Sequence, residues 1–255
     1  MAQSLAFNAD CMEAMRQFPD GFFDLAVVDP PYGDGSSQTV NVERAAAMEP
    51  LRPTLRPLQN SNNRGGWKHY QGANVKKPDG TWGYANWRRL VDEVRPNKKI
   101  ISWDVAPKQE YFEELFRISR NQIIWGGNYF SLPPTRCFLI WRKLTISESF
   151  SMAMAEYAWT SFNSNAKVFE YAPQGQGDRF HPTQKPVALY AWIFKNYTQP
   201  GMKIIDTHLG SGSSRIAAYD AGLDFWGYEI DKTYFELQEE RFEKHSAQMN
   251  LFLMD

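Results

Sequence analysis

The sequence is poor in cysteine. It holds Cys11 and Cys137 among its 255 residues, and neither belongs to a Cys-x-x-Cys or a paired His/Cys pattern. Two distant cysteines cannot build a disulfide framework, and they lack the ligand spacing of a structural zinc site. We therefore expect reduced thiols, no metal centre and a cytoplasmic location.

Long apolar runs and an excess of one charge are also missing. No stretch approaches the roughly 18 apolar residues that span a bilayer, and the N-terminus lacks a basic-then-apolar signal pattern. The net charge is −1 and the pI is about 6.4, so the whole chain does not have the charge of a basic nucleic-acid binder. Any nucleic-acid surface must be local, and no membrane association is expected.

What is present is an alternation of short apolar runs and amphipathic stretches. It predicts one α/β domain with a doubly wound, mixed but mostly parallel sheet of the Rossmann-like class. The expected strands are 4–8, 24–28, 99–103, 122–125, 202–205 and 224–229, with 137–141 and 156–160 as an antiparallel edge. The expected helices are 11–18, 84–94, 109–119, 186–197, 214–221 and 232–245.

One segment, residues 33–83, lacks apolar periodicity. Gly, Pro, Asn, Gln, Arg and Lys dominate it, which is typical of a long inserted loop. Residues 51–90 hold eight Lys or Arg against the single acid Asp79, a local excess of 8 − 1 = +7. We therefore expect a single catalytic domain over 1–255 with 33–83 as a basic inserted loop.

The string Asp29-Pro30-Pro31-Tyr32 directly follows the apolar run Leu25 to Val28. In open α/β sheets, ligands bind outside the carboxyl ends of such strands. Each proline fixes its own φ, donates no N–H and pushes the preceding residue out of the helical region. The Asp29 carboxylate, the Pro30 carbonyl and the Tyr32 ring are thus predicted to form a rigid site for a planar amine.

A second candidate site begins after the strand that ends near Ile205. The run Asp206 to Ser214 contains Gly210 and Gly212, which let the backbone approach a ligand at a helix N-terminus. Glu229 lies 229 − 210 = 19 residues after Gly210, at the end of the next expected strand, where an acid accepts ribose hydroxyls. Arg215 stands in place of the third glycine of a dinucleotide motif, so the pattern favours a nucleoside-like ligand without a pyrophosphate.

The order of these motifs resembles the amino-methyltransferases of the permuted β group, which methylate exocyclic amines of DNA bases with S-adenosylmethionine. Asp29 to Tyr32 comes first, His181-Pro182-Thr183-Gln184-Lys185-Pro186 follows, and the glycine motif with Glu229 comes last. Asn8-Ala9-Asp10-Cys11 also looks like a short segment of this family, whose acid binds the adenine amine of the methyl donor.

The resemblance implies site residues. The implied catalytic residues are Asp29, Pro30, Pro31 and Tyr32. The implied cofactor-binding residues are Asp10, Cys11, Asp29, His181, Thr183, Lys185, Asp206, Leu209, Gly210, Ser211, Gly212, Ser213, Glu229 and Ile230. In two places the sequence departs from the family: Thr207-His208 replaces the usual Pro-Phe, and the stretch from Trp159 to His181 is short.

The short stretch leaves the basic insertion as the candidate for reading DNA, with residues 161–179 as a further contributor. Its candidate DNA-binding residues are Arg52, Arg56, Arg64, Lys68, Lys76 and Lys77, and Trp67 and Trp82 could stack on bases. By resemblance to this family, Asp at position 29 implies the N6 amine of adenine as target, with duplex DNA as substrate, a flipped target base and a homodimer as expectations. N4-cytosine or RNA methylation and a catalytically silent DNA-binding module remain alternatives.

Overall fold

The computed structural model describes residues 2–33, 74–76, 82–84, 105–147, 153–173, 180–181 and 183–252. The chain divides into two compact units. The first comprises Met1–Tyr32 and Ala106–Asp255, and the second comprises Gly33–Val105. No helix in the described ranges is long and apolar enough to cross a membrane.

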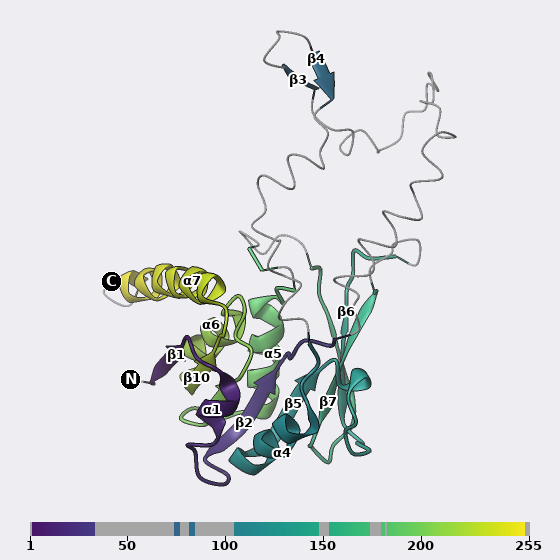
Figure 1. The fold of residues 1–255 in the computed structure, drawn as a ribbon, viewed down its shortest axis with the longest axis vertical. Coiled ribbons are helices and arrows are strands. Elements are labelled where there is room, and N and C mark those ends of the chain that lie inside the picture. The colour runs from purple at the N-terminus through teal and green to yellow at the C-terminus, as the bar shows by residue number, and fades with distance from the viewer. Residues whose placement is uncertain are drawn as a thin grey trace. The chain divides into compact units, whose positions relative to one another are not determined.

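The first unit is built on an eight-stranded sheet in the order β1-β10-β9-β2-β5-β7-β6-β8 (Figure 1). The strands are β1 (Ser4–Phe7), β2 (Phe23–Val28), β5 (Ser119–Trp125), β6 (Phe138–Arg142), β7 (Ala155–Thr160), β8 (Lys167–Glu170), β9 (Lys203–Asp206) and β10 (Asp224–Tyr228). From β1 to β5 the neighbouring strands pair in parallel. β7 is antiparallel to both β5 and β6, and β8 pairs with β6 in parallel.

Helices cover both faces of this sheet. The helices are α1 (Cys11–Met15), α4 (Gln109–Ile118), α5 (Val187–Tyr197), α6 (Ser213–Asp220) and α7 (Lys232–Phe252). Along β2, Leu25 and Val27 pack in the same apolar cluster as α5 and α6, whereas Ala26 and Val28 pack with α1 and α4. Because successive side chains of a strand point to opposite faces, a strand covered on both faces has to be apolar throughout.

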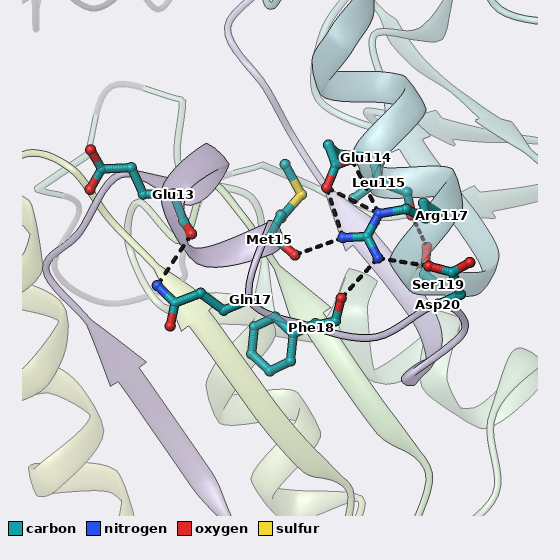
Figure 2. A network of polar contacts seen from close by, with 9 residues as sticks. All are labelled: Glu13, Met15, Gln17, Phe18, Asp20, Glu114, Leu115, Arg117 and Ser119. Carbon is teal, nitrogen blue, oxygen red and sulfur yellow. Dashed lines mark hydrogen bonds and ion pairs between the residues drawn. The ribbon is translucent and has the colours of Figure 1, made fainter.

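Arg117, a half-buried residue of α4, connects this helix to the end of α1. Figure 2 shows the Arg117 guanidinium donating to the backbone carbonyls of Met15 and Phe18 and to the carboxylates of Asp20 and Glu114. The carbonyl oxygens at the end of α1 have no partners within the helix, so these bonds satisfy part of that end. The Arg117 contacts thereby fix the connection that leads from α1 into β2.

The structure confirms the predicted fold class and most of the predicted elements. α1 ends at Met15 rather than Phe18, and β8 was not predicted, because a four-residue edge strand of alternating exposure carries little apolar signal. The antiparallel edge formed by β6 and β7 is confirmed. The predicted strand 99–103 and nearly all of the predicted helix 84–94 lie outside the described residues.

In the second unit, the described hairpin corrects one expectation. β3 (Asn74–Lys76) pairs antiparallel with β4 (Trp82–Tyr84) inside the segment that was expected to lack regular structure, and Tyr84 ends a strand rather than starting a helix. Pro78-Asp79-Gly80 stands between the two strands in the sequence, a composition typical of turns. That turn composition was the available signal for the hairpin.

Candidate active site

Four carboxylates follow neighbouring strands at one edge of the sheet. Asp206 ends β9 and Glu229 follows β10, whereas Asp29 and Asp10 come just after β2 and β1. These four strands lie side by side and run parallel, so their carboxyl ends meet at the same edge. The two predicted site segments, 29–32 and 206–214, therefore lie next to each other.

Contacts to both carboxylate oxygens hold Asp29 in place. The Tyr32 hydroxyl donates to Oδ1 over 3.0 Å, and the Lys185 ammonium contacts Oδ2. Burial is the largest influence on the pKa of Asp29 and raises it, while Lys185 opposes that rise. Burial and the Asp29 charge also raise the pKa of Tyr32 far above its usual range, so its hydroxyl stays protonated as a donor.

Gly126 lies against the face of the Tyr32 ring, where a larger residue would not fit. A Cβ on Gly126 would lie 2.1 Å from Cε1 of this ring and 2.6 Å from both Cδ1 and Cζ, distances that place it above the ring face rather than at the ring edge. The Tyr129 ring is also stacked on Tyr32, with centroids 4.7 Å apart and planes 12° apart, and Tyr129 is half exposed. Gly126 has a φ of +68°, which only glycine adopts readily.

The glycine turn after β9 is fastened to the end of β10 through Glu229. The Gly210 N–H donates to Glu229 Oε2 over 2.8 Å, and the Asp231 N–H donates to Oε1 over 2.9 Å. Gly210 and Gly212 have φ values of +52° and +72°. Leu209, Ser211 and Ser213 are buried, whereas Ile230 is exposed. The turn thus has the backbone shape that the sequence predicted.

Asp206 lies beneath this turn and is itself buried. It accepts from the His208 N–H over 3.1 Å and from the Ser214 hydroxyl over 2.5 Å. Burial is the main cause that raises the pKa of Asp206 to about 7, and the charge of Asp29 contributes to the rise. The same edge of the sheet therefore holds two acids that influence each other.

At the end of β1, Asp10 caps the first helix. Its Oδ1 accepts from the N–H groups of Met12 and Glu13 over 2.7 Å and 3.2 Å, an ordinary N-cap. Asn8 donates to the backbone carbonyls of Glu229 and Ile230 and so joins this segment to the end of β10. Burial raises the pKa of Cys11 to about 12, so its thiol is neutral.

The segment before α5 reaches both parts of the site. The His181 ring lies where a Cβ on Gly210 would meet it at 3.3 Å, and the Thr183 hydroxyl lies 3.2 Å from His181 Nδ1. Lys185 is almost fully buried, and its ammonium contacts Asp29 rather than the glycine turn. The segment 181–185 thus joins the two predicted site segments.

Thr207 and His208, which depart from the family pattern, contact α4. The Thr207 hydroxyl lies 2.6 Å from the Tyr111 hydroxyl and 3.0 Å from His208 Nδ1. The rings of Tyr111 and His208 meet edge to face, with centroids 5.4 Å apart. Burial lowers the pKa of His208 to about 4, so its imidazole is neutral at neutral pH.

Comparison with known proteins now decides the family. A family model described as DNA methylase, of the N6/N4 methyltransferase type, matches residues 57–240. The chain belongs to this family. It is a DNA amino-methyltransferase, and S-adenosylmethionine is its methyl donor. The match begins after Tyr32, so it includes the motifs from His181 to Glu229 but not Asp29 to Tyr32.

Several known proteins are similar to this chain along most of its length. The type II methyltransferase M2.MboI of Moraxella bovis is 23% identical over 248 residues, which covers 92% of this chain and 86% of that protein. PvuII DNA methyltransferase, described as cytosine-N4-specific, has a TM-score of 0.50 and 13% identity, covering 98% of this chain and 93% of that one. A structure described as an M1.HpyAVI–SAM complex has a TM-score of 0.48 and 16% identity, covering 94% and 98%.

Sequence reasoning missed several residues of the candidate site. Gly126 and Tyr129 belong to the turn after β5, and Glu156 lies in β7 with its carboxylate 3.2 Å from the Lys185 ammonium. The pair Gly126-Gly127 after an apolar strand was a usable signal, while a single glutamate in an edge strand gave none. Within the described ranges, no group of three or more His, Cys, Asp or Glu is arranged to hold a metal ion.

Nearly all candidate DNA-binding residues lie outside the described part of the chain. These are Arg52, Arg56, Arg64, Lys68 and Lys77, together with Trp67. Lys76 ends β3, and Trp82 begins β4. Their role in binding DNA stays a prediction.

Proposed function

We propose that this DNA methyltransferase acts on the N6 amine of adenine in duplex DNA, with Asp29 to Tyr32 as the amine site. The observation that carries the proposal is the Asp29 carboxylate just after β2, fixed by Tyr32 and Lys185 beside Asp206, which ends β9, and Glu229, which follows β10. The family supplies the reaction class, and Asp at position 29 favours adenine over cytosine by resemblance to that family.

The proposed role of Asp29 follows from the weak nucleophilicity of an aromatic amine. The nitrogen lone pair is delocalised into the base, so it attacks carbon poorly. Hydrogen bonds from the amine to the Asp29 carboxylate and the Pro30 carbonyl favour a pyramidal nitrogen and stabilise the positive charge that develops on it. Asp29 need not be a strong base, because the amine becomes acidic only after methylation and can release its proton to solvent.

The proposed role of Tyr32 is to stack on the target base after the base has left the duplex. Such stacking contributes on the order of 1 to 3 kcal/mol. The hydrogen bond from Tyr32 to Asp29 joins the stacking surface to the acceptor, so both would position the same base. Holding the amine about 3 to 3.5 Å from the methyl carbon would supply much of the remaining rate enhancement.

S-adenosylmethionine, when bound, supplies a methyl group on a positively charged sulfur, which is an electrophile for the amine lone pair. The acids at the ends of β10 and β1 fit this ligand. Each Glu229 oxygen accepts one backbone N–H and retains a lone pair for a ribose hydroxyl. Both helix-capping bonds of Asp10 go to Oδ1, which leaves Oδ2 for an adenine amine.

We expect Glu229→Gln to weaken S-adenosylmethionine binding. The amide nitrogen of glutamine would face one of the N–H groups of Gly210 or Asp231 and could not accept from it. Hydrogen bonds to a charged group contribute about 1.5 to 3 kcal/mol, so the Kd should rise about tenfold to a hundredfold. Titration calorimetry measures this, with the exposed Glu236→Gln as the control. An unchanged Kd would remove Glu229 from the cofactor site.

Tritium transfer tests the proposed substrate. The intact chain is incubated with S-adenosylmethionine labelled in its methyl group and with unmethylated duplex DNA made by polymerase amplification, and the DNA is then digested to nucleosides. Label in N6-methyladenine is the expected result. Label in N4-methylcytosine instead would overturn the choice of base, label only when RNA is supplied would overturn the choice of DNA, and tight DNA binding without transfer would indicate a silent DNA-binding module.

We further propose that the basic segment around residues 52–77 contacts the DNA backbone. Support comes from its local charge excess in a chain whose net charge is −1. Lys and Arg that neutralise phosphates make binding weaken as salt rises. We also propose that the target base leaves the duplex, that the reaction requires no metal and that the protein forms a homodimer.

A further inference from the structure

Four charged side chains of alternating sign form a chain that ends at Asp29. The Lys185 ammonium contacts Asp29 Oδ2 and lies 3.2 Å from Glu156 Oε2, and the Lys143 ammonium lies 2.6 Å from Glu156 Oε1. Lys143 follows β6, Glu156 belongs to β7, and Lys185 precedes α5. This charge chain (Lys143, Glu156, Lys185 and Asp29) therefore connects the antiparallel edge of the sheet to the proposed acceptor.

The charge chain is shielded from solvent. The side chains of Lys185 and Lys143 are 4% and 8% exposed, and those of Asp29 and Glu156 are 14% and 25% exposed. Removing charges from water costs several kcal/mol per ion, and pairing offsets this only in part. Two acids and two bases balance the charge, but stability alone is a weak reason for such an arrangement. Ionisable groups with shifted pKa values cluster at functional sites, where they tune the reacting groups.

We propose that Glu156 is a positioning residue that divides the positive charge of Lys185 between two carboxylates and thereby sets how strongly Asp29 accepts from the target amine. This inference rests on the proposed role of Asp29. A carboxylate paired with an undivided ammonium is a weaker acceptor for a third group. Glu156 draws part of the Lys185 charge away, and Lys143 in turn compensates Glu156.

Several other ionisable groups influence Asp29 or are influenced by it. Tyr32 lies on its own segment, Asp206 ends β9, Tyr111 belongs to α4 and Tyr190 to α5. Lys185 also affects the pKa of Tyr32 and of Tyr190, and Glu156 affects that of Tyr32, but burial raises both tyrosine pKa values, so these hydroxyls stay protonated across the acidic limb. A change in the titration of Asp29 in such variants is therefore due to the charge chain.

The two inner members of the charge chain should shift the titration of Asp29 in opposite directions. Lys185 lowers the pKa of Asp29, and Glu156 raises it. Lys185→Met should therefore move the acidic limb of the profile of kcat against pH to higher pH, and Glu156→Gln should move it to lower pH. A unit charge at 4 to 6 Å commonly changes a pKa by about 1 to 3 units, so each shift should be about one pH unit. Glu156→Gln should also lower the plateau rate.

The measurement is tritium transfer to amplified, unmethylated duplex DNA between about pH 5 and pH 9. Glu170→Gln is the matched control, because its carboxylate pairs with Arg142 in the same sheet but is half exposed. This control should keep the wild-type profile. Thermal unfolding of every variant separates loss of structure from loss of rate.

Opposite shifts would support the inference, whereas shifts in the same direction or no shifts would overturn it. If Lys185→Met fails to fold, Glu156→Gln alone tests the inference, because glutamine keeps the shape of the glutamate side chain. An acidic limb of the kcat profile that stays in place in Glu156→Gln would then contradict the proposal. A near-normal rate in both Asp29→Ala and Asp29→Asn would instead overturn the proposed function. If Asp29 is essential and neither limb moves, only the inference about Glu156 fails.

Discussion

Replacing Asp29 with alanine is expected to lower methyl transfer to DNA on the order of 10² to 10³-fold, while S-adenosylmethionine still binds. The carboxylate is the proposed acceptor for the target amine, and its loss removes an interaction that strengthens as positive charge develops on nitrogen. The glycine turn and Glu229 are fastened by their own hydrogen bonds, so the cofactor site should persist. Tritium transfer and titration calorimetry measure the two effects separately.

The expected stability of the Asp29 variants matters for this test. Removing one partner of a buried ion pair can cost about 3 to 5 kcal/mol, because the other charge is left behind. In Asp29→Ala, Lys185 retains Glu156 as a partner at 3.2 Å. Asp29→Asn keeps the size of the side chain and an acceptor oxygen, and should lose less activity than alanine. A near-normal rate in both variants would show that the acceptor lies elsewhere.

Replacing Gly126 with alanine is expected to impair turnover much more than replacing Gly222. Both residues have left-handed backbones, with φ of +68° and +66°, so each substitution carries a similar strain of about 1 to 2 kcal/mol. A Cβ at Gly126 would meet the Tyr32 ring at 2.1 Å, whereas one at Gly222 meets nothing within 4 Å. Displacing Tyr32 would lose base stacking of about 1 to 3 kcal/mol, roughly a fivefold to 150-fold loss of kcat/KM.

The comparison of Gly126→Ala with Gly222→Ala separates backbone strain from the contact with Tyr32. Unfolding measurements should show at least as much destabilisation in Gly126→Ala as in Gly222→Ala, because the Tyr32 ring must also move. Among the folded proteins, only Gly126→Ala should lose activity. In a Tyr32→Ala background, Gly126→Ala should have little further effect on kcat/KM, because residues that act through one contact are not additive. Equal activity losses in the two glycine variants, or full additivity with Tyr32→Ala, would contradict a role of Gly126 in seating Tyr32.

The strands of the parallel part of the sheet were predictable because their signal is local. Leu25 to Val28 is apolar on both faces and is followed by two prolines, so the strand and its end are both evident from composition. The position of Asp29 beside Asp206 was decided by the strand order, which places β2 next to β9. β8 and the β3–β4 hairpin were missed because these short strands lack the buried apolar run that marks the equally short β9.

The sequence by itself determined the order of the motifs, the two glycines of the turn and the acid after β10, because each depends on residue type at a fixed spacing along the chain. Only the tertiary structure decided that Lys185 contacts Asp29, that Glu156 and Lys143 continue this contact, and that Gly126 lies against the Tyr32 ring. Lys185 and Asp29 are 156 residues apart along the chain, and Gly126 and Tyr32 are 126 − 32 = 94 residues apart. Contacts over such separations are fixed by strand order and packing, for which a single sequence carries no local signal.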